Sequence, residues 1–125
     1  MAIELNHTIV HTKDKLKSAT FLSEILGLPA PVPFAHFLVV RTENRVTLDF
    51  LETPEEFDKQ HYAFLVSEKE FDQIFARIKE RKLPYWADPR KSQPNQTYTL
   101  NGGRGCYFED PSGHILEILT RPYVD

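Results

Sequence analysis

The feature that most constrains the fold is a repeated order of elements in the two halves of the chain. Each half opens with a histidine at the head of an apolar, strand-like run, His7 in the first half and His61, 54 positions later, in the second. An amphipathic helical pattern and further strand-like runs follow each histidine. We interpret this order as an internal duplication of a strand-helix-strands unit. It predicts an α+β protein with helices outside and curled sheets facing each other.

The segments of the first half follow from apolar patterning and turn residues. We expect a strand over residues 3–11 and then a helix that ends at Gly27, because glycine accepts the left-handed conformation that stops a helix. Two further strands are expected over residues 34–40 and 45–51, joined by a turn at Glu43-Asn44.

The second half repeats this scheme. A strand is expected over residues 61–66, and the segment from Ser67 to Glu70 has the pattern of a capping box at the start of a helix. After the helix a short strand is expected to start at Tyr85-Trp86, and three more strands are expected over residues 97–100, 105–109 and 114–120. The second half therefore has the same order of elements as the first.

Length and composition narrow the class of protein. Residues 1–125 have the length of one domain, with modules at about 3–53 and 60–121. The net charge of -3 and the lack of a basic stripe argue against nucleic-acid binding. No apolar stretch approaches the ~20 residues of a membrane helix. The single cysteine, Cys106, cannot form an internal disulfide. We expect a cytoplasmic protein that binds neither nucleic acid nor membranes.

Three residues in strand-like runs form a candidate metal site. His7 and His61 supply imidazoles, and Glu117 lies at the centre of an apolar run, where an isolated charge would cost several kcal/mol to bury. Two histidines and a carboxylate are a familiar ligand set for divalent metals. If the three side chains converge, the protein is a metal-dependent enzyme.

Strand alternation adds Asp49 as a fourth candidate ligand, because it lies inside another apolar strand-like run. Each half then contributes one imidazole and one carboxylate, His7 with Asp49 and His61 with Glu117, the pattern that a duplicated site would leave behind. For Asp49 a solvent-facing position on a half-exposed sheet is an equally good explanation, since Thr47 shares its face.

These residues resemble the vicinal oxygen chelate superfamily, which includes glyoxalase I, methylmalonyl-CoA epimerase, fosfomycin-resistance proteins, extradiol dioxygenases and bleomycin-resistance proteins. The resemblance rests on Leu5-Asn6-His7, on His61-Tyr62-Ala63-Phe64 and on the closing run from Tyr107 to Glu117. It implies two βαβββ modules that form a cup of curled mixed sheet around a divalent metal. His7, His61 and Glu117 then fall on ligand positions, and Asp49 falls where glyoxalase I carries a fourth ligand.

The resemblance implies a lyase or isomerase of the glyoxalase and epimerase type as the first hypothesis for function. A metal would bind two neighbouring oxygens of a small substrate and stabilise an enediolate-like intermediate, with Asp49 or Glu117 as the base. Tyr107 and Arg104 are expected to contact the substrate. Superfamily members of this length commonly pair, so the resemblance also implies a homodimer, in which ligands sometimes come from both chains.

Two alternatives stay open. An extradiol-type ring-cleaving dioxygenase would use the same triad with Fe(II) or Mn(II), and Tyr107, ten residues before Glu117, fits that branch. The additional upstream histidine of that branch is missing here. A non-catalytic small-molecule-binding module of the resistance type would need no metal, and an intact triad argues against it. The ligand set suits Mn, Fe, Ni, Zn and Mg alike.

Overall fold

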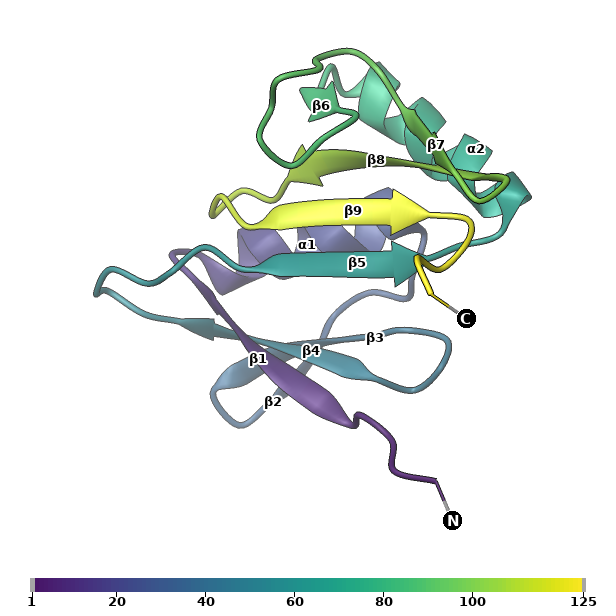
Figure 1. Cartoon of the computed structure of the whole chain (residues 1–125). Coiled ribbons are helices and arrows are strands. Elements are labelled where there is room, and N and C mark those ends of the chain that lie inside the picture. The colour runs from purple at the N-terminus through teal and green to yellow at the C-terminus, as the bar shows by residue number, and fades with distance from the viewer. Residues whose placement is uncertain (1, 125) are drawn as a thin grey trace. The chain divides into compact units, whose positions relative to one another are not determined.

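The computed structural model describes residues 2–124, which belong to two compact units, Met1–Asp58 and Lys59–Asp125. Each unit combines one helix with one mixed sheet in the order β-α-β-β-β, and the second unit has a short additional strand (Figure 1). The predicted α+β class and its two βαβββ modules are thereby confirmed. Neither of the helices described is both long enough and apolar enough to cross a membrane.

Unit 1 is a four-stranded sheet, sheet A, with a helix on one face. Its strand order is β1-β4-β3-β2, in which β1 (His7–Thr12) is parallel to β4 (Thr47–Glu52). The antiparallel neighbours are β3 (Phe37–Arg41) and the edge strand β2 (Val32–Phe34). Helix α1 (Lys15–Leu26) packs on β3 and β4. The buried apolar residues of this unit are Val10, Ala19, Leu22, Ile25, Leu38, Val40, Leu48 and Phe50.

The ends of two predicted strands differ in unit 1. The expected strand over residues 34–40 is divided by a turn at Ala35-His36, where Ala35 has a φ of 52°. That turn holds no glycine, proline or asparagine, so no residue type marked it in the sequence. Strand β1 begins at His7 instead of residue 3, because the side chain of Ile3 is fully exposed, at 104%, and covers no core.

Unit 2 is a five-stranded sheet, sheet B. Strand β5 (His61–Leu65) is parallel to β9 (Ile115–Leu119), and β8 (Gly103–Glu109) runs antiparallel to β9 on its other side. Two short strands, β6 (Tyr85–Trp86) and β7 (Tyr98–Leu100), pair with successive parts of β8.

Helix α2 (Glu68–Glu80) begins with the predicted capping box. The Ser67 hydroxyl accepts from the Glu70 backbone N–H, and the Glu70 carboxylate accepts from the Ser67 backbone N–H. These two bonds satisfy donors that the first turn of a helix otherwise leaves unpaired. The buried apolar residues of this unit include Phe71, Ile74, Ile78, Cys106, Phe108, Leu116 and Ile118.

The two sheets hold their histidine and their acid in the same register. His7 pairs with the residue two positions before Asp49, and His61 pairs with the residue two positions before Glu117. In both parallel pairs the imidazole and the carboxylate are therefore diagonal neighbours on one face of the sheet. The duplication predicted from the order of elements extends to the pairing of individual residues.

Candidate metal site

Glu117 is a fully buried carboxylate in the middle of β9, with 0% of its side chain exposed. Its two oxygens have different partners. Oε1 lies 3.0 Å from Nε2 of His61, and Oε2 accepts hydrogen bonds from the hydroxyls of Tyr98 and Tyr123. A buried charge of this kind is tolerated only where such partners surround it.

The ring of His61 is oriented by the backbone. Its Nδ1 lies 3.1 Å from the carbonyl oxygen of Ile115, and a carbonyl oxygen only accepts, so the hydrogen-bond network assigns a hydrogen to Nδ1. Nε2 then points at Oε1 of Glu117, a contact that requires a hydrogen or a cation between the two atoms. The side chain of His61 is 47% exposed, so a cation can reach this edge of the ring.

The pair fits a divalent metal. An imidazole nitrogen and a carboxylate oxygen are both ordinary ligands of divalent metals, and Nε2 of His61 lies 3.0 Å from Oε1 of Glu117, close enough for both to bind one ion. The contact of Nδ1 with a backbone carbonyl is also typical of metal-binding histidines. Over residues 2–124 no three His, Cys, Asp or Glu side chains form a metal cluster. Of the four candidate ligands, the structure brings His61 and Glu117 together within unit 2.

Three tyrosines surround Glu117. Tyr98 comes from β7 and Tyr123 follows β9, while Tyr107 is the direct neighbour of Glu117 in β8. The hydroxyls of Tyr107 and Tyr123 are 2.9 Å apart, and the ring of Tyr107 stacks on that of His61 with centroids 5.7 Å apart. Because two hydroxyls occupy Oε2, the carboxylate is held with Oε1 directed at the imidazole.

These tyrosines remain hydrogen donors. Burial is the largest cause that raises the pKa of the phenols of Tyr98, Tyr107 and Tyr123 above their usual range, and the nearby Glu117 carboxylate raises each further. A raised pKa keeps a phenol protonated at neutral pH. Tyr98 and Tyr123 therefore donate to Glu117 without taking up its negative charge.

A glycine allows Tyr98 to reach the carboxylate. Gly105 is the partner of Tyr98 in the pairing of β7 with β8, and a Cβ at Gly105 would lie 2.3 Å from the tyrosine side chain. The next residue, Cys106, is fully buried, and burial raises the pKa of its thiol to about 12. A thiol of that kind is a core residue and not a nucleophile.

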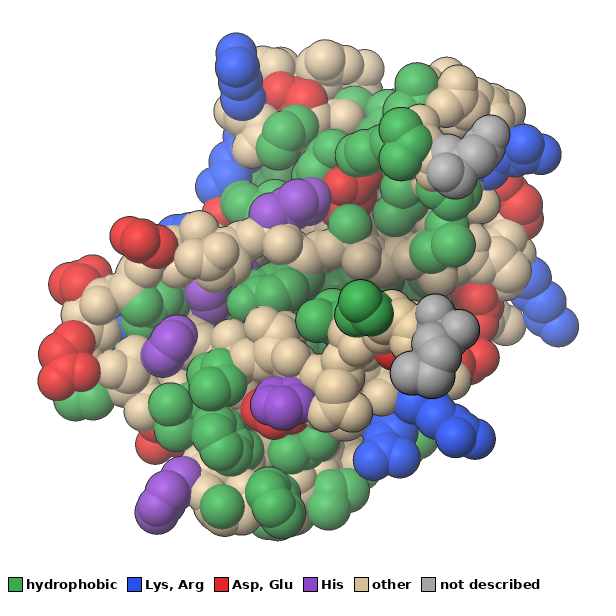
Figure 2. Space-filling view, turned by 60° about the horizontal axis from the view of Figure 1, so that its bottom comes forward, with side chains coloured by type: hydrophobic (Ala, Val, Ile, Leu, Met, Phe, Trp, Pro, Cys, Tyr) green, Lys and Arg blue, Asp and Glu red, His purple; other side chains and the backbone are tan. Residues whose placement is uncertain are grey.

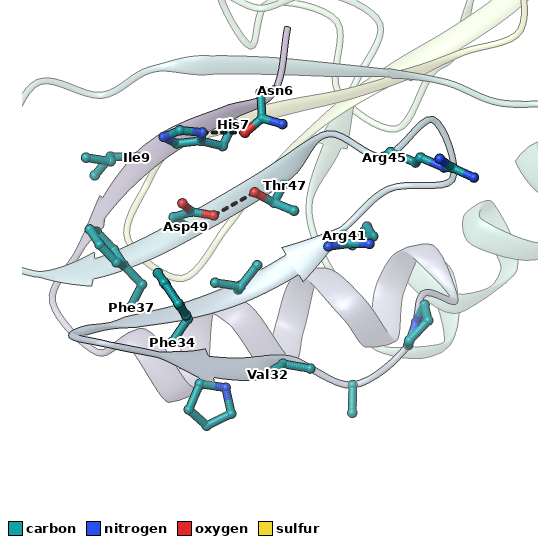
Figure 3. Close-up of a pocket in the computed structure, with 14 residues that line it drawn as sticks. Asn6, His7, Ile9, Val32, Phe34, Phe37, Arg41, Arg45, Thr47 and Asp49 are labelled. Carbon is teal, nitrogen blue, oxygen red and sulfur yellow. Dashed lines mark hydrogen bonds between the residues drawn. The ribbon is translucent and has the colours of Figure 1, made fainter.

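Within unit 1, His7 and Asp49 line a cavity of about 710 Å³ on sheet A (Figure 3). Nδ1 of His7 lies 2.7 Å from Oδ1 of Asn6, which assigns a hydrogen to Nδ1 and leaves Nε2 as the nitrogen that can bind a metal. The hydroxyl of Thr47 donates to Oδ1 of Asp49 at 2.8 Å. The imidazole and the acid of unit 1 thus share one cavity, and each has a polar neighbour within it.

The two predicted substrate contacts lie on opposite faces of β8. Tyr107 is on the same face as Glu117, beside His61. Arg104, an odd number of residues away, points toward α2, where its guanidinium binds Glu68 at 2.7 Å and Asp72 at 2.6 Å. The structure does not bring Arg104 to Glu117.

Tyr98 and Tyr123 belong to the site but were not predicted from the sequence. Tyr98 pairs with a glycine on the neighbouring strand. This pairing can be recognised only once the register of β7 with β8 is known. Tyr123 lies beyond the last strand, where no periodicity applies.

The chain is similar to known proteins over nearly all of its length. A model of the Glyoxalase/Bleomycin resistance protein/Dioxygenase superfamily matches residues 4–118. A glutathione transferase, FosA of Serratia marcescens, is 32% identical over 124 residues, which cover 94% of this chain and 81% of that protein. Among solved structures, oxidase ChaP-H1 has a TM-score of 0.97 and 56% identity, covering 99% of this chain and 100% of that one. Oxidase ChaP-H2 has a TM-score of 0.96 and 53% identity, covering 100% and 98%.

Proposed function

The chain belongs to the glyoxalase/bleomycin resistance protein/dioxygenase superfamily, and from this membership we propose that it is a divalent-metal-dependent enzyme that oxidises a small organic molecule. The observation that carries the proposal is the pair formed by the accessible imidazole of His61 and the fully buried carboxylate of Glu117, whose 3.0 Å separation fits a metal. His7 would complete a set of two histidines and one carboxylate, which leaves other metal positions open. The 56% identity to oxidase ChaP-H1 favours oxidation over other reactions of the superfamily.

The residues of the chain have distinct tasks in this proposal. A bound divalent metal would supply Lewis acidity toward neighbouring oxygens of the substrate and, as Fe(II), a place for dioxygen as the oxidant. Tyr98 and Tyr123 hold Oε2 of Glu117 and so keep Oε1 available as a single ligand atom. Tyr107 stacks on the His61 ring and supports its orientation.

A second candidate is proton transfer of the glyoxalase and epimerase type, and Asp49 favours it. This carboxylate lies in the sheet A cavity, where Thr47 donates to only one of its oxygens. A substrate oxygen held near His7 would bring an adjacent C–H group close to Asp49, which would take the proton as a general base. Asp49→Asn separates the two reactions, because it removes this base and leaves His61 and Glu117 intact.

Metal binding is the first test. The purified protein should bind a divalent metal in one-to-one ratio, measured by elemental analysis after reconstitution without oxygen. His61→Ala and Glu117→Gln should each weaken that binding by at least about tenfold. Glu109→Gln is the matched control, since Glu109 lies on the same sheet and pairs with Lys91. A wild-type protein that binds no metal, or variants that bind it unchanged, would overturn the proposal.

Turnover then separates the reactions. Oxygen uptake by the iron-loaded protein with catechols or other aromatic substrates that carry adjacent oxygens supports the oxidase. Proton exchange or isomerisation of oxoaldehyde–thiol adducts without oxygen uptake, lost in Asp49→Asn, supports the second candidate. Tight binding of small molecules without metal and without turnover would instead identify a binding module.

A further inference from the structure

We propose that the cavity on sheet A binds an organic anion with an extended apolar body, and that Arg41 and Arg45 hold its acidic group. The inference rests on the proposed function and deepens it, because it names the substrate class of the cavity in which His7 and Asp49 lie. Apolar and charged side chains are distributed unevenly along that cavity, and this distribution supports the proposal.

Strand register arranges the lining of the cavity in rows. One end is polar, and its row crosses three strands through His7, Thr47 and Arg41. The next row, two residues further along each strand, holds Ile9, Asp49, Val39 and Val32. The opposite end is apolar, with Phe34 paired to Phe37 across the tight turn between β2 and β3. The cavity therefore changes from cationic to apolar along the direction of the strands (Figure 3).

The apolar end is suited to the body of a ligand. The side chains of Phe34 and Val32 are 71% and 62% exposed, which is unusual for large apolar groups that lie together. Apolar side chains also reach the surface beside histidines in Figure 2. A concave, mainly apolar cavity of about 710 Å³ falls within the range of small-molecule sites.

The other end is suited to an acid. Within the described residues neither Arg41 nor Arg45 has an ion-pair partner, whereas the guanidinium of Arg104 is bound by two carboxylates. Arg45 also has a φ of 67°, in the left-handed region where glycine fits without strain. An unpaired guanidinium presents a fork of donors that matches carboxylate, sulfonate or phosphate oxygens.

The position of Asp49 orients the ligand. Its carboxylate lies in the middle row and repels an acidic group from the centre of the cavity, which directs that group to the arginine end. From Arg41 to Phe37 the strand rises about 13 Å over four residues, so the apolar body extends over a comparable length. The segment of the ligand that adjoins its acidic group then lies beside His7 and Asp49. This segment is uncharged and carries oxygen atoms.

A matched pair of probes tests this assignment. Anilinonaphthalene sulfonate is an aromatic anion, and phenylnaphthylamine is nearly the same body without the acid. Fluorescence titration should give a lower Kd for the sulfonate than for the neutral probe. Arg41→Gln should raise the Kd of the sulfonate by about tenfold and leave that of the neutral probe unchanged. Arg90→Gln, an exposed arginine that does not line the cavity, is the control and should bind both probes as the wild type does.

Arg45→Gly provides a variant that folding should tolerate, because glycine accepts the left-handed backbone of this turn. It should also weaken sulfonate binding, with unchanged near-ultraviolet circular dichroism. Naphthoate and naphthyl phosphate are then tested for displacement of the probe, which ranks carboxylates against phosphates. The proposal is contradicted if neither compound displaces the probe. Equal binding of the sulfonate to wild type, Arg41→Gln and Arg45→Gly also contradicts it.

The titrations are done with and without the metal, so that the two proposals fail separately. If the protein binds no metal but discriminates between the probes as expected, the anion site stands and the oxidase proposal fails. If the metal binds and the probes are not discriminated, the anion site fails and the metal site stands.

Discussion

Glu117 and Asp49 hold the same place in the register of their sheets but have different surroundings. Two phenols donate to one oxygen of the fully buried Glu117, whereas the shorter and only half-buried Asp49 accepts from a neighbouring threonine. The longer and more firmly held carboxylate is suited to a permanent ligand. The less constrained one is suited to a ligand or base that exchanges its partner when a substrate binds.

Removal of one phenol should loosen Glu117. In Tyr98→Phe the ring still covers Gly105, but Oε2 loses one of its two donors. We expect the metal affinity to fall by about tenfold, as for other groups that orient a metal ligand, with an unchanged fold. A competition titration against a chelator measures the change. Tyr85→Phe removes a hydroxyl from a ring that packs on Phe75 and should have no effect, whereas equal affinities in both variants would show that Tyr98 does not position Glu117.

At the scale of elements, both helices end in the same way. In α1 the left-handed residue after the helix is Gly27, with a φ of 73°, and the following N–H of Leu28 bonds to the carbonyl of Ser23. In α2 the corresponding residue is Lys82, with a φ of 56°, and the N–H of Leu83 bonds to the carbonyl of Ile78. Only the first of these ends has the residue type that the geometry favours.

This difference predicts opposite effects of two substitutions. Gly27→Ala should lower the free energy of unfolding by about 1 kcal/mol, because a side chain is strained in the left-handed region. Lys82→Gly should raise it by up to about 1 kcal/mol for the same reason. Urea denaturation measures both, with Lys82→Ala as the control that keeps the strain. Stabilisation by Lys82→Ala equal to that by Lys82→Gly would show that the lysine side chain, and not its backbone, is unfavourable.

Sequence patterns predicted elements well where a specific residue type marks a boundary. The glycine after α1 and the serine–glutamate pair before α2 each satisfy backbone groups locally, so both helix ends were predictable. The turn at Ala35-His36 has no such mark and was missed. Burial of Glu117 was predictable because its strand is apolar on both sides. The direction of the Arg104 side chain was not predictable, because it depends on which face of β8 lies against α2.

The site was predictable only in part for a related reason. His61 and Glu117 belong to parallel strands that are neighbours in the sheet, so the duplicated pattern placed them together. Tyr98 and Tyr123 approach from a short edge strand and from the segment after β9, and their positions depend on tertiary packing. No local pattern reports such contacts.

At the scale of the whole molecule, the proposed ligands are divided between the two units: His7 belongs to one, and His61 and Glu117 belong to the other. As a homodimer, which the superfamily resemblance implies, the protein would be able to take these ligands from two chains. Mixing variants distinguishes this arrangement from a site within one chain.

The mixing test uses His7→Ala and Glu117→Gln, each of which lacks one proposed ligand. If sites are shared between chains, refolding an equal mixture should restore metal binding to about a quarter of the wild-type sites, because half of the dimers are mixed and each has one complete site. Metal analysis of the mixture measures this. A mixture of His61→Ala with Glu117→Gln is the control, since both lesions fall in the same unit. No recovery in the first mixture would place all ligands in one chain.

The common register of the two sheets has a consequence for how such a chain diversifies. A single ancestral module that carried one imidazole and one acid would have been under one selective demand. Two modules in one gene are free to change separately. In this chain the acid of unit 2, Glu117, is the longer one and has aromatic neighbours, whereas the acid of unit 1, Asp49, is shorter and lies in a cavity lined by two arginines. New substrates are then expected to arise from changes in unit 1, with the metal-binding pair of unit 2 unchanged.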